Sequence, residues 1–307
     1  MIDITLLGTA ALVPLPERAL TSVFLKCAGH SILFDCGEGT QTSARKTGVG
    51  LMKVDMIALS HYHGDHIFGL PGLLQTMCSM GRTEPLYLTG PEGLCEALEP
   101  VLKLVGWTSY EIRLIELPPE GLRLEELNSG WPYEAVLSAF RTEHRVSSQG
   151  YCFTLERAGK FFPQKAKDLG VPPNQWGLLQ KGQSVRVANT IVLPEQVLGE
   201  PRKGLKFVFS GDTASCETLV NAAKDADLLI CEGTYGENDQ AQLAIDHGHM
   251  NFAQAADVAR TAGARQLWLA HFSQLMEDPQ DYLVNATHIF PNTLCGETGM
   301  SLLMQFE

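Results

Sequence analysis

Short runs of β-branched and aromatic residues alternate along the chain with longer stretches in which apolar residues recur every three or four positions. The short runs predict strands at Ile4–Leu7, Val23–Lys26, Ile32–Asp35, Met56–Leu59, Leu86–Leu88, Val136–Thr142, Tyr151–Leu155, Leu205–Ser210, Leu228–Cys231 and Leu267–Ala270. The longer stretches predict helices at Leu70–Met80, Glu92–Leu104, Cys216–Ala226 and Asn251–Ala262. This alternation predicts an α/β protein.

One segment interrupts the pattern. Residues 157–200 are rich in proline and glycine and show little periodicity, which predicts a protruding insertion in an otherwise single domain spanning residues 1–307. Between Arg157 and Arg186 there are six basic residues and one acid, a net charge of +5, which leaves −17 for the rest of the chain. A solvated loop explains this segregation as well as a docking surface does.

Composition restricts the class of protein. The 307 residues are 45% hydrophobic, enough for a large core without disulfides, and the eight cysteines form no C-x-x-C pair, so we expect a reducing, cytoplasmic setting. No apolar run approaches the roughly 20 residues that a membrane span needs, and no basic, then apolar, signal begins the chain, so we expect neither membrane insertion nor export. The net charge of −12 argues against binding polyanions over the whole surface.

The strongest chemical signal is the run from His61 to His66, which reads His-Tyr-His-Gly-Asp-His directly after a predicted strand. Three imidazoles and a carboxylate at this spacing suit Zn²⁺, with Mn²⁺ or Fe as alternatives, and Gly64 permits a tight turn that lets the side chains converge. A histidine-rich surface loop is the alternative reading, but it explains neither Asp65 nor the apolar flanks.

Three further polar residues follow or lie near the ends of other predicted strands, namely His144, Asp212 and His271. Each residue alone is weak evidence for a metal site, but together they supply the ligands that a two-metal centre still needs. With Asp212 bridging, one ion takes His61, His63 and His144, and the other takes Asp65, His66 and His271. Two such ions stabilise both the attacking and the leaving oxygens of a phosphodiester, so the motif predicts hydrolysis.

These residues resemble the metallo-β-lactamase superfamily over nearly the whole chain, which implies a four-layered αββα sandwich. Within it, longer strings resemble the ribonuclease Z family, the endonucleases that remove 3′ trailers from precursor tRNA. The strings are Leu7-Gly8-Thr9, Phe34-Asp35-Cys36-Gly37-Glu38-Gly39-Thr40-Gln41, the run from His63 to Leu74 (HGDHIFGLPGLL), and Phe209-Ser210-Gly211-Asp212-Thr213.

The resemblance carries over catalytic roles. Asp65 is implied both as a metal ligand and as the base that orients the attacking water, with Asp35 supporting the site from behind. Glu232 and His249 are implied to handle the proton of the leaving 3′-oxygen, although their neighbours differ from the family's usual His-Glu-Ala-Thr and His-Ser-Thr. His247, two residues before His249, is a competing candidate.

The insertion is similar to the family's flexible arm, which grips tRNA far from the cut. The resemblance implies a homodimer in which the arm of one subunit serves the other, and it singles out the arm lysines as tRNA contacts: Lys160, Lys165, Lys167 and Lys181. Phe161, Phe162 and Trp176 either stack on bases or pack within the arm. The family's Pro-Pro-Gly-Pro reads Pro172-Pro173-Asn174-Gln175 here, and the usual Arg-Tyr after the last metal histidine is absent.

The sequence therefore predicts an endoribonuclease with two Zn²⁺ ions per subunit that leaves a tRNA 3′-hydroxyl and a 5′-phosphorylated trailer. Three alternatives stay open. One is a small-molecule hydrolase of the same superfamily, such as a cyclic nucleotide phosphodiesterase or an arylsulfatase-like enzyme. The others are a catalytically silent RNA-binding scaffold that keeps metal for stability, and an iron-dependent redox protein on the same fold.

Overall fold

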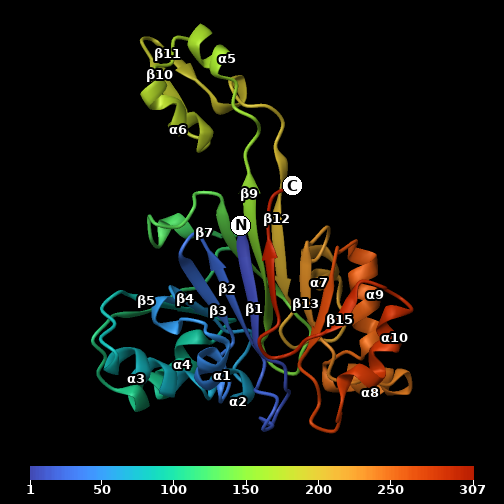
Figure 1. The fold of residues 1–307 in the computed structure, drawn as a ribbon. Coiled ribbons are helices and arrows are strands. Elements are labelled where there is room, and N and C mark those ends of the chain that lie inside the picture. Colours follow the sequence, from blue (N-terminus) through green and yellow to red (C-terminus); the bar gives the residue numbers. More distant parts are fainter.

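The computed structural model describes residues 1–307, and its core is built from two mixed seven-stranded sheets (Figure 1). The first sheet is antiparallel from β16 to β3 and parallel from β3 to β6. Its strands, in spatial order, are β16 (Ser301–Met304), β1 (Ile2–Gly8), β2 (Ser22–Cys27), β3 (His30–Phe34), β4 (Met56–Ala58), β5 (Leu86–Thr89) and β6 (Ile112–Leu114).

The second sheet mirrors this plan. It is parallel from β12 to β15 and antiparallel from β12 to β7. Its strands, in spatial order, are β15 (Thr293–Cys295), β14 (Leu267–Ala270), β13 (Leu228–Glu232), β12 (Arg202–Phe209), β9 (Gln149–Arg157), β8 (Ala135–Arg141) and β7 (Leu122–Arg123).

Helices cover the outer face of each sheet. The first sheet carries α1 (Thr40–Thr47), α2 (Gly64–Ile67), α3 (Leu70–Ser79) and α4 (Leu94–Val105), and the second carries α7 (Glu217–Ala222), α8 (Ala241–His247), α9 (Phe252–Ala262) and α10 (Leu283–Thr287). One buried apolar cluster fills the space between the two sheets. A second cluster lies between the first sheet and its helices, and a third lies between the second sheet and its helices. This is the αββα sandwich that the sequence predicts.

All ten predicted strands are present, and the helix prediction needs corrections. The predicted helix Cys216–Ala226 is shorter, because Asp225 takes a left-handed conformation (φ 55°) that a helix does not accommodate. The pattern of hydrophobic and polar residues does not predict six of the strands, four helices of the body or the short 3₁₀ turns. The 3₁₀ turns are Leu51–Lys53, Leu124–Glu126, Pro173–Gln175, Pro194–Gln196, Asn238–Gln240 and Pro279–Tyr282.

The insertion, called the arm below, protrudes from one end of the sandwich (Figure 1). Although its sequence shows little periodicity, the arm contains α5 (Pro163–Asp168), α6 (Trp176–Gln180) and a hairpin of β10 (Val185–Val187) and β11 (Thr190–Val192). It has a core of its own, formed by Ala166, Val171, Leu179, Val185, Val192 and Val197. The segment is therefore a small folded unit on a two-stranded stalk.

Strand β9 connects the two ends of the molecule. At its start, the backbone N–H of Gln149 donates to the carbonyl of Ser60, next to His61, and at its end Arg157 pairs with Arg202 at the base of the arm. Eight steps of about 3.4 Å place the arm's base about 27 Å from the His61 end. The arm and the histidine cluster thus lie at opposite ends of the sandwich.

Candidate metal centre

The seven predicted metal ligands meet at one edge of the sandwich. The segments that follow β4, β12 and β14 supply most of them, with Asp65 and His66 on α2, and His144 comes from the β8–β9 connection. Carboxyl ends of parallel strands point to the same edge of a sheet, so side chains distant in sequence converge there. Groups of ligand atoms within 4.8 Å of one another are His61, His63 and His144; His61, His66 and Asp212; and Asp65, His66 and His271.

The first group is three nitrogens that face a common point. Nε2 of His61 lies 2.9 Å from Nδ1 of His63, and Nε2 of His144 lies 3.4 Å from the same atom. His63 therefore presents Nδ1, whereas the other two present Nε2. Zn–N bonds are about 2.0–2.1 Å, so nitrogens at this spacing fit around one ion.

The second group surrounds the carboxylate of Asp212. Its Oδ2 lies 3.4 Å from Nε2 of His66, 3.2 Å from Nε2 of His271 and 3.7 Å from Nε2 of His61, so one oxygen faces both groups. Oδ2 of Asp65 lies 3.5 Å from both Nε2 of His66 and Nε2 of His271. Asp212 is thus placed between the two groups.

In four of the histidines, Nε2 faces the metal position and Nδ1 contacts a neighbouring group of the protein. Nδ1 of His66 contacts Oδ2 of Asp35 at 2.7 Å, and Nδ1 of His61 contacts the hydroxyl of Ser60 at 3.0 Å. The remaining pairs are Nδ1 of His144 with the carbonyl of Gly248 at 2.9 Å and Nδ1 of His271 with the hydroxyl of Thr234 at 3.0 Å. Such contacts fix ring orientation and aim Nε2 at the metal.

Backbone strain collects at the same edge. Asp35 (φ 56°), His271 (φ 58°) and Leu12 (φ 60°) all adopt the left-handed conformation, which is uncommon without glycine. The strained Leu12 donates its backbone N–H to Oδ2 of Asp65 at 2.8 Å. This hydrogen bond, which no sequence motif signals, orients a predicted ligand.

Glu232 and His249 form a pair beside the ligands. Oε1 of the buried Glu232 lies 2.9 Å from Nδ1 of His249, and Oε2 accepts from the hydroxyl of Thr234, which also contacts His271. His247, the competing candidate, lies elsewhere, with Nδ1 2.6 Å from the hydroxyl of Tyr235. Thr234 was not predicted as a functional residue from the sequence, although it lies only two positions after Glu232.

Charge and burial set the protonation of these groups. Burial and the neighbouring His66 lower the pKa of His61 to about 2. Although burial raises the pKa of Asp212, its electrostatic interactions with His271, His66 and His61 hold that pKa well below its usual range. Burial also lowers the pKa of His249, but the charge of Glu232 and the hydrogen bond to it raise that pKa to about 9. The contact with Glu232 thus favours the protonated form of His249.

The donor set fits divalent metal ions. Nε2 of His66 and Nε2 of His271 are buried and have no hydrogen-bond partner, an arrangement that costs free energy unless another group binds them. Imidazole nitrogens and carboxylate oxygens converging in this way are the ligands that Zn²⁺, Mn²⁺ and Fe take in proteins. The cluster is a divalent-metal site.

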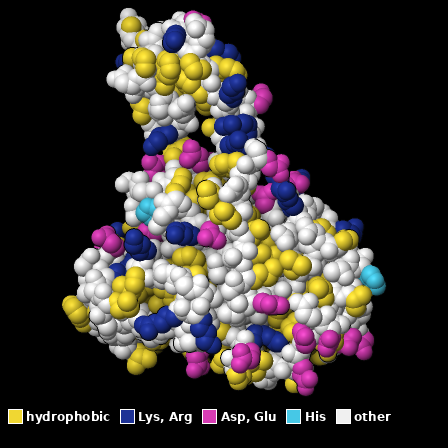
Figure 2. Space-filling model, viewed as in Figure 1, with side chains coloured by type: hydrophobic (Ala, Val, Ile, Leu, Met, Phe, Trp, Pro, Cys, Tyr) yellow, Lys and Arg dark blue, Asp and Glu magenta, His cyan; other side chains and the backbone are white.

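The structure places the arm residues away from this centre. All four arm lysines are exposed, and Figure 2 shows Lys and Arg side chains gathered on the arm and its stalk. Nζ of Lys181 lies 3.7 Å from Glu125 of the body. The ring of Trp176 packs against Phe161, with centroids 5.4 Å apart, and its indole N–H donates to the carbonyl of Val171, so these aromatics pack the arm itself.

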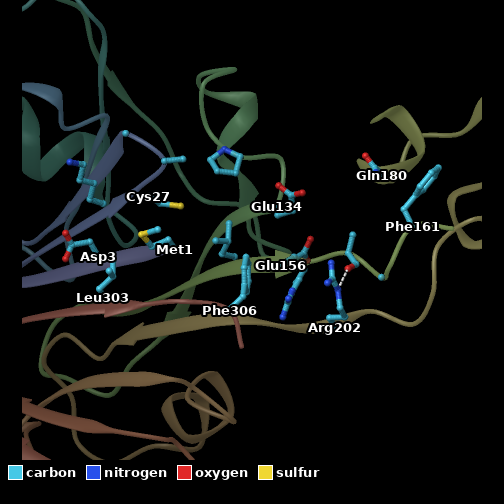
Figure 3. A pocket seen from close by; sticks show the side chains of 18 of the residues that line it. Met1, Asp3, Cys27, Glu134, Glu156, Phe161, Gln180, Arg202, Leu303 and Phe306 are labelled. Carbon is cyan, nitrogen blue, oxygen red and sulfur yellow. Dashed lines mark hydrogen bonds between the residues drawn. The ribbon is translucent and has the colours of Figure 1, made fainter. Parts of the chain in front are cut away.

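A cleft of about 770 Å³ lies at the base of the arm, and none of the metal ligands lines it (Figure 3). Its walls come from both termini, the β2–β3 turn and the stalk. Both cations and carboxylates face it, among them Arg202 and Glu134 (Figure 3). The histidine cluster, with its buried and oriented donors, remains the site equipped for chemistry.

Comparisons with known proteins agree with the fold and the site. Residues 2–162 match the family model described as Anti-Pycsar protein Apyc1, so this half of the chain belongs to that family, and residues 196–272 match the Beta-lactamase superfamily domain. Neither model covers residues 163–195 of the arm. The fold and the ligand set define a metal-dependent hydrolase of the metallo-β-lactamase class.

Full-length relatives specify the family. The chain is 40% identical to Ribonuclease Z of Clostridium tetani, covering 100% of both proteins, and 37% identical to that of Lachnoclostridium phytofermentans, covering 100% of this chain and 99% of the relative. The crystal structure of human tRNase Z, short form, is 27% identical, with a TM-score of 0.68 and coverage of 99% and 100%. The chain belongs to the ribonuclease Z family. No helix is long and apolar enough to cross a membrane.

Proposed function

We propose that this chain is a tRNA 3′-processing endoribonuclease that uses two Zn²⁺ ions per subunit and works as a cytoplasmic homodimer. The observation that carries the proposal is the convergence of the predicted ligands into two groups that share Asp212. A phosphodiester cut needs charge stabilisation on both the attacking and the leaving oxygen, and paired ions provide it. Mn²⁺ or Fe would accept the same donors.

The residues divide the work. One ion would be held by His61, His63 and His144, the other by Asp65, His66 and His271, with Asp212 shared. When bound, such ions lower the pKa of water and stabilise the negative charge that develops on the phosphate.

Asp65 is fixed by the Leu12 N–H, so its carboxylate is set to orient the attacking water and accept its proton. His249, protonated and paired with Glu232, is set to donate a proton to the leaving 3′-oxygen. The products are then a tRNA 3′-hydroxyl and a trailer with a 5′-phosphate.

The arm supplies binding rather than chemistry. Its basic side chains concentrate attraction for phosphate on an otherwise acidic molecule, which suits docking of tRNA at one place. Because the arm points away from its own subunit's metal centre, we assign it to the substrate held at the partner's centre. A dimer formed from one Asp212→Ala subunit and one arm-deleted subunit should then cleave precursor tRNA faster than either parent homodimer does.

The decisive experiment is to incubate the metal-loaded protein with a precursor tRNA and map both new ends. A single cut after the discriminator nucleotide, with a 3′-hydroxyl on the tRNA, is the expected result. Intact precursor in the presence of vigorous hydrolysis of bis(4-nitrophenyl) phosphate would instead indicate a small-molecule hydrolase. Failure to hydrolyse either compound with full metal occupancy would favour the silent scaffold.

A further inference from the structure

A second cavity, of about 560 Å³, adjoins the metal centre on the side of His144. His144 lines it directly, and Nε2 of this histidine lies 3.4 Å from Nδ1 of His63. Binding pockets for small molecules and cofactors occupy about 300–1,000 Å³, so the cavity is large enough for one nucleotide. None of the roles assigned above uses it.

One side of the cavity is cationic. Arg141 and Arg145 both line it and are exposed, while Glu92 is the carboxylate residue among its lining residues. The guanidinium of Arg145 donates to the backbone carbonyl of Asp246 at 2.9 Å, which fixes it beside the loop that carries His249. The side chain of Arg141 makes no ion pair or hydrogen bond within the chain, so its donors are free. Two arginines at one cavity stand out on a chain with a net charge of −12.

The lining also contains apolar residues. Leu117, Pro118 and Pro119 form a continuous stretch of the lining, and the ring of Phe140 lies against the backbone of Gly150, where an added Cβ would come within 2.2 Å of it. Apolar side chains and guanidinium groups in one cavity are the combination that an unpaired nucleotide needs, because its base packs on the former and its phosphate binds the latter.

We propose that this cavity is a nucleotide subsite: Arg141 and Arg145 bind the phosphate adjacent to the scissile phosphate, and the Leu117–Pro119 stretch contacts the base. The inference rests on the proposed function, since it requires a polynucleotide at the metal centre. An RNA chain whose scissile phosphate lies at the metal ligands has to continue away from them along the protein surface. The cavity next to His144 is one such path, and its arginines can bind the adjacent phosphate.

The test measures kcat/KM on precursor tRNA for Arg141→Ala, Arg145→Ala, the double variant and Arg141→Lys, with bis(4-nitrophenyl) phosphate as a second substrate. Arg45→Ala is the matched control, because Arg45 is exposed on α1 and outside the cavity. We expect selectivity for tRNA over the diester to fall about 10-fold for each alanine variant, and the slope of log kcat/KM against log salt concentration to decrease by about 1. Lysine should restore part of the loss.

Substrates with a neutral methylphosphonate linkage on either side of the cut identify the phosphate. At one of the two linkages, the neutral methylphosphonate should lower the kcat/KM of the wild-type enzyme about as much as Arg141→Ala does. The same linkage should not lower the kcat/KM of the Arg141→Ala variant any further. Wild-type selectivity and salt slope in the double variant would overturn the subsite, as would equal losses with both linkages in wild type and variant. If the wild-type protein leaves precursor tRNA uncut, the proposed function fails first, and the two failures are thereby distinguished.

Discussion

The metal centre and the arm are built on opposite principles. The centre takes side chains from loops of both sheets, so it exists only when the sandwich core of the whole chain is formed. The arm is folded around six small buried residues and joined to the body by two strands. The first region fixes its groups rigidly for chemistry, and the second carries charge that needs only approximate placement.

The difference extends to polar contacts. At the centre, neighbouring side chains hold the buried histidines and carboxylates in place. His66, for example, lies between two carboxylates, with Nδ1 against Asp35 and Nε2 facing Asp212. On the arm, the lysines project into solvent, and Lys165 merely lies over the ring of Phe162. Losses of metal ligands should therefore act on turnover with any substrate, and losses on the arm should act on tRNA alone.

The largest effect is expected from Asp212→Ala. Removing the shared carboxylate separates the two ligand groups, and loss of several kcal/mol of charge stabilisation corresponds to a decrease on the order of 10⁴-fold or more in kcat. The decrease should appear with both precursor tRNA and bis(4-nitrophenyl) phosphate. Metal content is measured in parallel, and near-normal turnover at full metal occupancy would contradict the shared-ligand arrangement.

A smaller effect, about 10²–10⁴-fold in kcat on precursor tRNA, is expected from His249→Ala, because general acids contribute in that range. Nitrophenolate leaves without a proton, so hydrolysis of the nitrophenyl diester should be much less affected. His247→Ala is the matched control, since His247 contacts Tyr235 rather than Glu232. Equal losses for both substrates would show that His249 acts on the metal ligands rather than on the leaving oxygen.

Deleting the arm separates binding from chemistry. Removal of Lys160–Leu198 joins Gly159 to Gly199, which already approach closely: an added Cβ on Gly159 would lie 1.9 Å from the carbonyl oxygen of Gly199. Two glycines suit a tight hairpin turn between the antiparallel β9 and β12. We expect kcat/KM on precursor tRNA to fall on the order of 10²-fold with the nitrophenyl diester still hydrolysed. Unaltered tRNA cleavage would remove the arm from the docking model.

The sequence predicts the centre better than the arm for a physical reason. His61 to His66 lie within one short string, so their chemistry is visible locally, and all ten predicted strands form because buried strands leave long apolar runs. Asp35 and Glu232 were reached through resemblance to a family. The Leu12 N–H on Asp65 depends on backbone conformation, which a residue pattern does not encode.

Edge elements and the arm's fold escaped prediction because they bury little. Strands β6 and β15 are three residues long, and β10 and β11 each contribute one side chain to the arm core. Proline and glycine in the arm indicate turns, but the spacing between Ala166 and Leu179 is too irregular to reveal that they share a core. Packing across such short elements is decided in three dimensions.

The smallest effects are expected from single arm lysines, and they rank by their partners. Lys167→Ala removes an exposed ammonium with no acidic partner, so we expect a few-fold loss in kcat/KM and a salt slope lower by about 1. Lys181→Ala should cost less, because Nζ of Lys181 already lies 3.7 Å from Glu125, which offsets part of its attraction for phosphate. Glu125→Gln frees that ammonium and should raise tRNA affinity slightly. Measuring Kd across salt concentrations checks the ranking, and a larger loss for Lys181 than for Lys167 would mean that α6, not α5, faces the substrate.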